Sequence, residues 1–420
     1  MLARECGYIQ RERKISSYDL LESCIFGRFE HNKMSLNDHC SYLLIHKGIT
    51  VSNQAVDKRF NEKSVTFVKK VLELVLSRHL KTKDYFTRLS KFNRVKIKDS
   101  VCFQAPDDFK DKYPGSGGAG SNAAVRIQFE YDLLSNRIEE LKVTPFNAQD
   151  IMDAQKTIKD VCENDLIIRD LGYITIDVLA DIEKSKAFYI NRSSYIDFYI
   201  RLASGDFQKL DLSKVERNMR KSEEKLRVLE VYLGTEKKYK TNLIIEPVPD
   251  EIKNQRLRKR HKINKKKGRS APKKALEREG LNLLLTNVPL SLLPKERIKE
   301  IYGIRWQIEM IFKAWKSVGG LHKVKRMDIS RFEFYLYAKL IFIVKNWNIL
   351  SALQNWTLGI KRKYISLYKL LKMFIIAGPE ATSSIIDRLL GTKNGYKIIC
   401  TQERKNRINK MSIKNILINC

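Results

Sequence analysis

Four side chains near residue 300 have types and spacing that suit chemistry on a phosphate. Tyr302, Arg305, Glu309 and Lys316 follow one another at intervals of 3, 4 and 7 residues. On a helix, at about 100° per residue, this spacing places all four within about 60° of arc. One carboxylate would then lie in line with two cations and a phenol, which suits a metal ion and a phosphate bound together. The structural alternative is a solvated helix flank with spaced charge pairs.

The surrounding residues 294–316 predict one long amphipathic helix that would position these groups. Pro294 suits the first helical position, Glu296 lies in the first turn, and Lys313 lies near the other end. Apolar residues recur at helical spacing and should form one buried face: Ile298, Ile301, Ile304, Ile308, Ile311, Phe312 and Trp315.

The pattern Tyr-x2-Arg-x3-Glu-x6-Lys resembles the signature of DDE transposases from bacterial insertion sequences, in the group named for insertion sequence four. The resemblance implies a ribonuclease-H-like core in which two aspartates from upstream strands join the glutamate of this helix. It assigns the third acidic role to Glu309. The upstream sequence should therefore supply two aspartates in suitable strands.

The composition favours a nucleic-acid partner. The chain has 420 residues and a net charge of +32, from 80 Lys plus Arg against 48 Asp plus Glu. The excess is spread from end to end, and a field this large in a folded chain points to a polyanion, with nucleic acid ahead of a membrane surface.

Cysteine usage and hydropathy indicate a cytoplasmic protein, associated with the nucleoid when bound to DNA. The seven cysteines are scattered and none forms a Cys-x-x-Cys pair, which argues against disulfides and zinc. The N-terminus has no apolar core typical of a signal peptide. The best candidate for a membrane span, 334–350, is interrupted by Lys339 and Lys345, so we expect no membrane association.

The first 90 residues predict helices that include a helix-turn-helix. An amphipathic segment should begin at Ser35 and end at Gly48, and a second helix should follow the N-cap residue Ser52. The second helix would carry candidate contacts to bases and phosphates: Asn53, Gln54, Lys58 and Arg59. A generic helix pair is the commoner explanation of such a segment.

From about residue 94 the pattern changes to strands. It predicts a strand at 94–103, a hairpin within 124–145, a helix near 148–162, a strand at 166–168, a helix at 174–185 and a strand at 186–192. This order is typical of a ribonuclease-H-like core. The first strand carries Asp99, and the fourth ends at Asp170.

The resemblance assigns the catalytic roles to these two aspartates. Asp99 lies in a segment similar to the family's first motif, and Asp170-Leu-Gly-Tyr matches the second, in which a small residue and an aromatic follow two and three positions later. Aspartates near strand ends are more often turn or cap residues. Asp165 and Asp177 have that explanation, and Asp107 or Asp108 are the alternatives to Asp99.

Between the core strands and the signature helix we expect a β-rich insertion at about 193–290, with strands at 195–203, 225–234 and 242–250. The family carries an insertion at this place. Within it, 256–274 holds eleven Lys or Arg in nineteen positions. The segment is either a solvated, poorly ordered loop or an arm that binds phosphates.

The predicted fold is therefore α/β, a ribonuclease-H-like mixed sheet with a β-rich insertion, flanked by helical regions. We expect a DNA-binding domain at 1–90, a catalytic domain at 91–330 and a helical C-terminal region at 331–420, which in the family supports a homodimer. The last thirty residues are basic and should be mobile.

The resemblance implies cut-and-paste transposition. Asp99, Asp170 and Glu309 would hold Mg²⁺ or Mn²⁺, with two ions expected, for hydrolysis at the transposon end and for attack of the freed 3′-hydroxyl on target DNA. Tyr302, Arg305 and Lys316 would bind terminal phosphates. Trp306 is either buried or a base-stacking residue for a hairpin end.

The expected partner is double-stranded DNA, both the inverted repeats at the ends of the element and the target. Two other functions remain open on the sequence. One is a catalytically inactive DNA-binding protein derived from a transposase, and the other is a ribonuclease-H-like nuclease that cuts without strand transfer. Metal-dependent cutting separates the enzymes from the binder, and strand transfer separates the two enzymes.

Overall fold

The computed structural model describes residues 1–400 except 12–13, 27–33, 78–88, 90, 118–119, 194–196, 235, 237–238, 267, 269, 271–272, 362, 364, 378–386, 390 and 393. The chain forms two compact units. The first comprises 1–88, 100–148 and 306–420, and the second comprises 89–99 and 149–305. The last twenty residues of the predicted basic tail lie outside the described residues.

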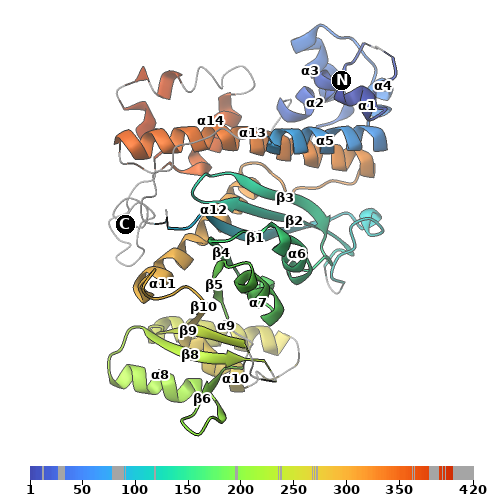
Figure 1. Cartoon of the computed structure of the whole chain (residues 1–420). Helices are drawn as coiled ribbons and strands as arrows, with labels where there is room; N and C mark the ends of the chain where they lie inside the picture. The colour runs from blue at the N-terminus through green and yellow to red at the C-terminus, as the bar shows by residue number, and fades with distance from the viewer. Residues whose placement is uncertain are drawn as a thin grey trace. The chain divides into compact units, whose positions relative to one another are not determined.

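Parallel strands form the part of the second unit that carries the predicted aspartates (Figure 1). Strand β1 (Arg94–Ala105) belongs to both units, because the boundary falls between Asp99 and Ser100. Strand β4 (Asp165–Arg169) pairs in parallel with β1, and β5 (Phe188–Arg192) pairs in parallel with β4. Helix α6 (Asp150–Thr157) precedes β4, and α7 (Ile176–Lys184) connects β4 to β5. The strands and helices predicted for 148–192 are confirmed, with a shorter first helix.

The insertion continues this sheet with antiparallel strands. In the second unit the strand order is β1-β4-β5-β10-β9-β8-β6-β7. The new strands are β6 (Tyr199–Arg201), β7 (Phe207–Lys209), β8 (Arg227–Leu233), β9 (Tyr239–Pro247) and β10 (Leu281–Thr286). The three predicted strands of the insertion are confirmed. The pattern missed β7 and three helices, α8 (Leu212–Lys221), α9 (Asp250–Lys266) and α10 (Lys273–Glu277).

The core of the second unit explains why this sheet is stable. Leu243 and Ile245 of β9 and Leu283 of β10 are at most 3% exposed. They join one cluster with Tyr189 of β5 and Leu179 of α7. The apolar area removed from water by such clusters is the main favourable contribution to folding, at about 25 cal/mol per Å².

In the first unit a hairpin supports two long helices. Strands β2 (Ala123–Asp132) and β3 (Ile138–Pro145) pair antiparallel, as predicted, and Asn136 in the turn adopts a left-handed φ of 54°. Phe129 of β2 contacts Trp315 of α12 (Trp306–Ser317) at a ring-centroid distance of 5.0 Å, and Trp347 of α13 (Ile329–Lys361) at 5.7 Å. Helices α13 and α14 (Leu367–Ala377) show that the C-terminal region contains helices, as predicted.

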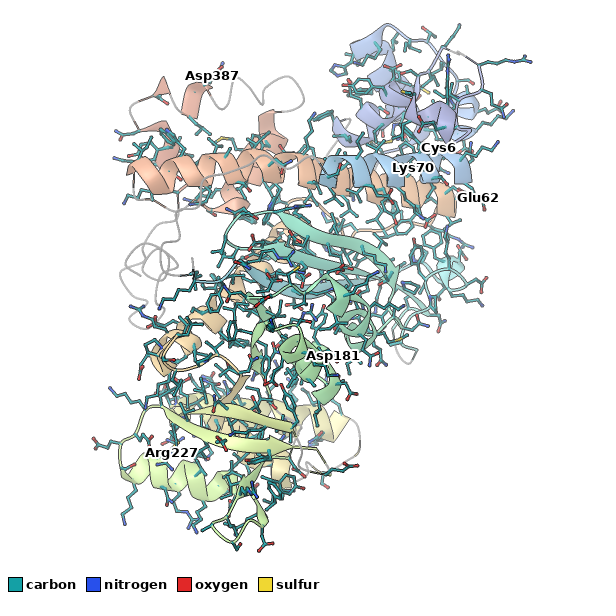
Figure 2. All side chains as sticks on the ribbon, viewed as in Figure 1. Cys6, Glu62, Lys70, Asp181, Arg227 and Asp387 are labelled. Atoms are coloured by element: carbon teal, nitrogen blue, oxygen red, sulfur yellow. The ribbon has the colours of Figure 1, made fainter. Side chains whose placement is uncertain are left out.

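The N-terminal helices pack on α13. They are α1 (Leu2–Glu5), α2 (Ser17–Phe26), α3 (Leu36–Lys47), α4 (Asn53–Asp57) and α5 (Glu62–Ser77). Buried His39 of α3 hydrogen-bonds Ser23 Oγ of α2 at 3.0 Å and the Tyr335 hydroxyl of α13 at 2.7 Å. Burial lowers the pKa of His39 to about 4, so the ring is neutral at physiological pH. Helix α5 lies alongside α13 and exposes Glu62 and Lys70 (Figure 2).

Within the described part of the chain, no helix is both long enough and apolar enough to cross a bilayer. The run 334–350 lies inside α13, where most of its side chains are buried against the first unit. It includes the buried ammonium of Lys339, which donates to the carbonyl of Gly320 at 3.1 Å.

Lys339 should make stability depend on pH. Burial, reinforced by Lys323, lowers its pKa to about 7. Between pH 7 and the usual lysine pKa the unfolded chain keeps a proton that the folded chain has released, so stability should rise with pH. Lys339→Met should remove this slope, which is worth up to about 4 kcal/mol. Urea unfolding at pH 7, 8.5 and 10 measures it. Exposed Lys345→Met is the control, and equal slopes in both variants would refute the assignment.

Candidate active site

The signature residues lie on two helices, and the prediction of a single helix over 294–316 is wrong. Helix α11 (Lys295–Ile304) ends at Arg305, whose N–H bonds the carbonyl of Tyr302 at 3.1 Å, and α12 begins at Trp306. Pro294 is the N-cap rather than the first helical residue. The unit boundary falls at the same place, between Arg305 and Trp306. The predicted apolar residues from Ile298 to Trp315 are nonetheless all buried.

Sheet register places Asp99 and Asp170 at the same level. Lys98 of β1 pairs with Arg169, the last residue of β4, and each aspartate directly follows its member of this pair. Adjacent strands lie roughly 4.8 Å apart. The two carboxylates, predicted from separate motifs, are therefore neighbours at one edge of the second unit.

Arg305 joins these two carboxylates. Its Nη1 lies 2.9 Å from Asp99 Oδ2 and 3.9 Å from Asp170 Oδ2. The side chains of Asp99 and Arg305 are 19% and 12% exposed, so water screens the pair only partly. Two carboxylates this close repel each other unless a cation lies beside them, and the guanidinium is that cation.

Tyr302 completes the group from one turn earlier on α11. Its hydroxyl donates to Asp170 Oδ1 at 3.3 Å, and its ring lies under the Arg305 guanidinium at 5.9 Å. Burial, followed by the negative charge of Asp170, raises the pKa of Tyr302 above its usual range, so the phenol keeps its proton and acts as a donor. Four residues predicted from three separate segments thus lie together in the second unit.

The motif that follows Asp170 has a packing explanation. A Cβ at Gly172 would lie 3.1 Å from Asp150 Oδ2 of α6, so only the smallest residue fits without displacement. Tyr173 is 1% exposed and belongs to the core of the second unit. The small residue and the aromatic together fix the turn that holds Asp170.

The remaining signature residues belong to the first unit. The Lys316 ammonium donates to the carbonyl of Cys102 on β1 at 3.0 Å, so this lysine is held against the strand that carries Asp99. Glu309 is exposed on α12. Trp306 is 39% exposed, so the alternative of a buried tryptophan is wrong. Among the residues that the structure describes, no three His, Cys, Asp or Glu side chains gather as a metal-binding group.

The competing aspartates have structural partners. Asp107 accepts hydrogen bonds from the Ser121 hydroxyl, which contributes most to lowering its pKa, and from the backbone of Asn122. Asp108 pairs with Arg326. Asp165 is buried and accepts two hydrogen bonds from Arg94, and Asp177 lies in the first turn of α7. These contacts explain each residue without catalysis.

The helix pair near residue 50 has the predicted caps. Ser35 caps α3, Gly48 ends it in a left-handed conformation, and the Ser52 hydroxyl accepts from Ala55 at the start of α4. Gln54 and Lys58 are exposed, and Asn53, also exposed, accepts a hydrogen bond from Cys40 Sγ. Arg59 instead points inward, where it donates to the carbonyl of Ile15 and lies over the ring of Tyr8.

Sequence reasoning missed Arg192, an exposed residue at the end of β5. Its positive charge contributes to lowering the pKa of Arg256 of α9 and opposes the rise in the pKa of Tyr302. Its only signal in the sequence was its place as a cation at the end of a core strand.

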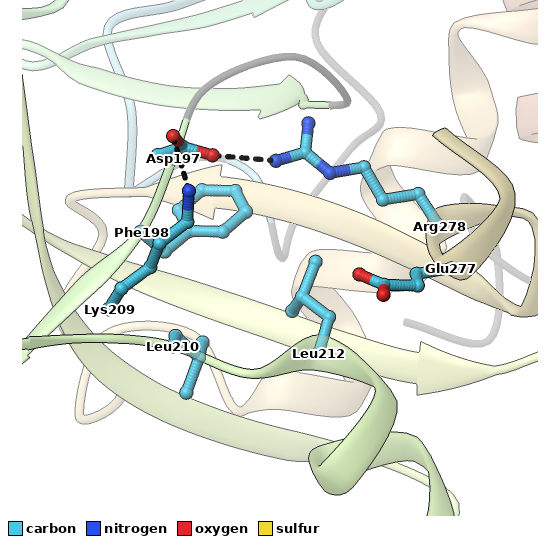
Figure 3. A pocket seen from close by; sticks show the side chains of 7 residues that line it. All are labelled: Asp197, Phe198, Lys209, Leu210, Leu212, Glu277 and Arg278. Atoms are coloured by element: carbon cyan, nitrogen blue, oxygen red, sulfur yellow. Dashed lines mark hydrogen bonds and ion pairs between the residues drawn. The ribbon is translucent and has the colours of Figure 1, made fainter. Parts of the chain in front are cut away.

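A small cavity lies in the insertion, away from the candidate active site residues (Figure 3). In its lining the Asp197 carboxylate lies 2.7 Å from Lys209 Nζ and also pairs with Arg278.

The contact at Gly172 should be measurable by a double-mutant cycle. Gly172→Ala should cost about 1 kcal/mol, because Asp150 must move away from the new Cβ. In an Asp150→Ala background the oxygen is gone, so the same change should cost less than half as much. Chemical unfolding of the four proteins gives the coupling. Equal costs in both backgrounds would show that the close contact of Asp150 Oδ2 with residue 172 does not require a glycine there.

Comparison with known proteins identifies the family. Residues 90–344 match the model of the Transposase DDE domain. The chain is 31% identical over 387 residues to the transposase for insertion sequence element IS231E of Bacillus thuringiensis subsp. finitimus, covering 89% of this chain and 81% of that one. It is 29% identical to the transposase for IS1151 of Clostridium perfringens, covering 88% and 81%.

Among solved structures, the chain aligns with a piggyBac transposase synaptic complex with hairpin DNA at 12% identity and a TM-score of 0.43, covering 98% of this chain and 84% of that chain. This likeness is too weak to support an argument. The match to the family model and the identity to the insertion-sequence relatives are sufficient to assign the family. The chain belongs to the DDE transposases of bacterial insertion sequences, enzymes that bind DNA, depend on divalent metal ions, and cleave and transpose their element.

Proposed function

We propose that Asp99, Asp170 and Glu309 are the three carboxylates with which this transposase cleaves its transposon ends and joins them to target DNA. The observation that carries the proposal is the meeting of Asp99 and Asp170 on adjacent parallel strands, with Arg305 between them. The order of hairpin, parallel strands and crossover helix supports a ribonuclease-H-like core. Glu309 is included because of its position in the Tyr-x2-Arg-x3-Glu-x6-Lys signature.

The donors at this site suit a hard divalent cation. Asp99 and Asp170 present carboxylate oxygens that are already compensated by a positive group, Arg305. Carboxylate oxygens and water are the ligands that Mg²⁺ and Mn²⁺ prefer. Two such ions would activate the attacking oxygen and stabilise the leaving oxygen in an in-line displacement at phosphorus. We therefore propose Asp99, Asp170 and Glu309 as their protein ligands.

The cationic and phenolic residues of the signature would bind the terminal phosphates. Arg305 holds the two carboxylates together, and it can exchange them for a phosphate once another cation compensates their charge. Tyr302 would remain a donor, since its phenol keeps its proton. Lys316 would contribute a second positive charge beside β1. Exposed Trp306, next to Arg305, would stack a base if the end passes through a hairpin.

The N-terminal helices would recognise the inverted repeats. Exposed Asn53, Gln54 and Lys58 are the proposed contacts of a helix-turn-helix, whereas the inward position of Arg59 favours a structural role. We propose that 1–90 binds DNA, that 91–330 catalyses the reaction, and that 331–420 supports a homodimer on DNA.

Loss of any one of the three carboxylates should abolish cutting. Asp99→Asn, Asp170→Asn and Glu309→Gln should each lower cleavage of a duplex carrying the element's end at least about 100-fold in Mg²⁺ or Mn²⁺. Binding of the same duplex should change less than about twofold, because other residues supply most of the DNA contacts.

Asp108→Asn is the matched control, since Asp108 pairs with Arg326 and should not affect cutting. Normal cleavage by an Asp99 variant would exclude that residue from the site. Cleavage without joining to target DNA would identify a nuclease rather than a complete transposase.

Arg305 should oppose metal binding when DNA is absent. Arg305→Gln removes the cation from Asp99 and Asp170, so Mn²⁺ should bind the DNA-free variant at least about threefold more tightly than wild type. Its cleavage should nevertheless fall, because the phosphate contact is lost. Electron paramagnetic resonance of free Mn²⁺ measures the affinity without relying on activity. Weaker metal binding by the variant would show that Arg305 organises the carboxylates rather than competing for them.

A further inference from the structure

Helix α9 separates its cations onto two faces. The five cations of its outer face are all exposed, and within the described residues their side chains form no hydrogen bond or ion pair: Arg258, Lys259, Lys262, Lys265 and Lys266. At about 100° per residue they span about 120° of the helix surface. From Arg258 to Lys266 the face extends about 12 Å. No Asp or Glu occurs between residues 252 and 266, so no acidic residue of the helix offsets this charge.

The inner cations of α9 fasten the helix to the second unit. Lys253 Nζ lies 2.8 Å from Glu216 of α8, and Arg260 pairs with Glu279. The guanidinium of Arg256 donates to Asn282 Oδ1 of β10 at 2.8 Å and to nearby carbonyl oxygens. The helix is therefore held by its inner cations, and the alternative of a poorly ordered loop is wrong for 256–266.

Close packing supports this attachment. A Cβ at Gly280 would lie 2.5 Å from the Glu216 carboxylate, so the absence of a side chain there lets Glu216 accept from both Lys253 and Arg220. The acidic residues that pair with α9 among the described residues, Glu216 and Glu279, contact its inner cations. The outer cations are thus available to a partner from outside the unit.

A further cation lies at the end of a core strand of the same unit. Arg192 is the last residue of β5 and is exposed. Its positive charge contributes to lowering the pKa of Arg256 of α9. Arg192 therefore adds to the positive charge of the second unit.

We propose that the outer face of α9 binds the phosphate backbone of duplex DNA without regard to sequence. The proposal rests on the proposed catalytic site and adds a DNA-contacting surface to it. Lysine and arginine on a regular helix match the spacing of phosphates but offer no fixed pattern to base edges. The expected partner is therefore any duplex, transposon end or target alike.

The test is the salt dependence of binding. The triple variant Arg258→Gln, Lys262→Gln, Lys265→Gln should weaken binding of the transposon-end duplex and of a scrambled duplex by the same factor, about tenfold or more near 0.1 M salt. The slope of log K against log salt should fall by about two to three, at about 0.9 per phosphate contact. Cleavage at saturating protein should remain close to wild type.

The control removes the same charge elsewhere in the unit. Lys184, Lys186 and Lys240 are exposed and paired with Asp181, Glu163 and Glu230. Changing all three to Gln should leave the salt slope unchanged. An equal fall in both triple variants would mean that only net charge matters, and a loss confined to the end duplex would mean that α9 reads sequence. Either result overturns the proposal. Failure of wild type to cut would instead concern the catalytic site, because the binding comparison is independent of cutting.

Discussion

Two like charges on neighbouring strands are the constraint on which the site depends. The parallel register of β1 and β4 brings the carboxylates of Asp99 and Asp170 to one level, and in a partly buried position they need a cation. Arg305 supplies it from the end of α11, where the α-helical hydrogen bonding changes before α12 begins. The sheet thus determines where the acids lie, and the helix end determines what neutralises them.

The same balance explains how a chain with a net charge of +32 forms packed units. Some of its cations are structural. Lys98 is fully buried and pairs with Asp153, and Arg94 pairs with Asp165. The ammonium of Lys339 donates a hydrogen bond to a backbone carbonyl inside the first unit. Others, such as those on the outer face of α9, have no acidic partner among the described residues. Net charge alone therefore does not identify a DNA-binding surface, and the distribution of acidic partners does.

The predictions from local pattern succeeded where one periodicity dominated. The alternation around Asp99 and the apolar run before Asp170 identified both strands, and the caps at Ser35, Gly48 and Ser52 were found where expected. The alternative of a poorly ordered loop failed for 256–266, because the charge of this segment concealed good helix formers stabilised by Glu216 and Glu279. Glu216 lies 37 positions from Lys253, and Glu279 lies 19 positions from Arg260, so no local pattern contains these pairs.

The sequence by itself determined the family, through the spacing of Tyr302, Arg305, Glu309 and Lys316, and it indicated two upstream aspartates as candidate ligands. Helical and strand periodicities are local, so residue order alone carries them. Only the tertiary structure decided that Arg305 bridges the aspartates, that the signature helix breaks beside it, and that Arg59 turns inward. Each of these depends on where distant segments meet, and partners for a charge are chosen by packing rather than by sequence neighbours.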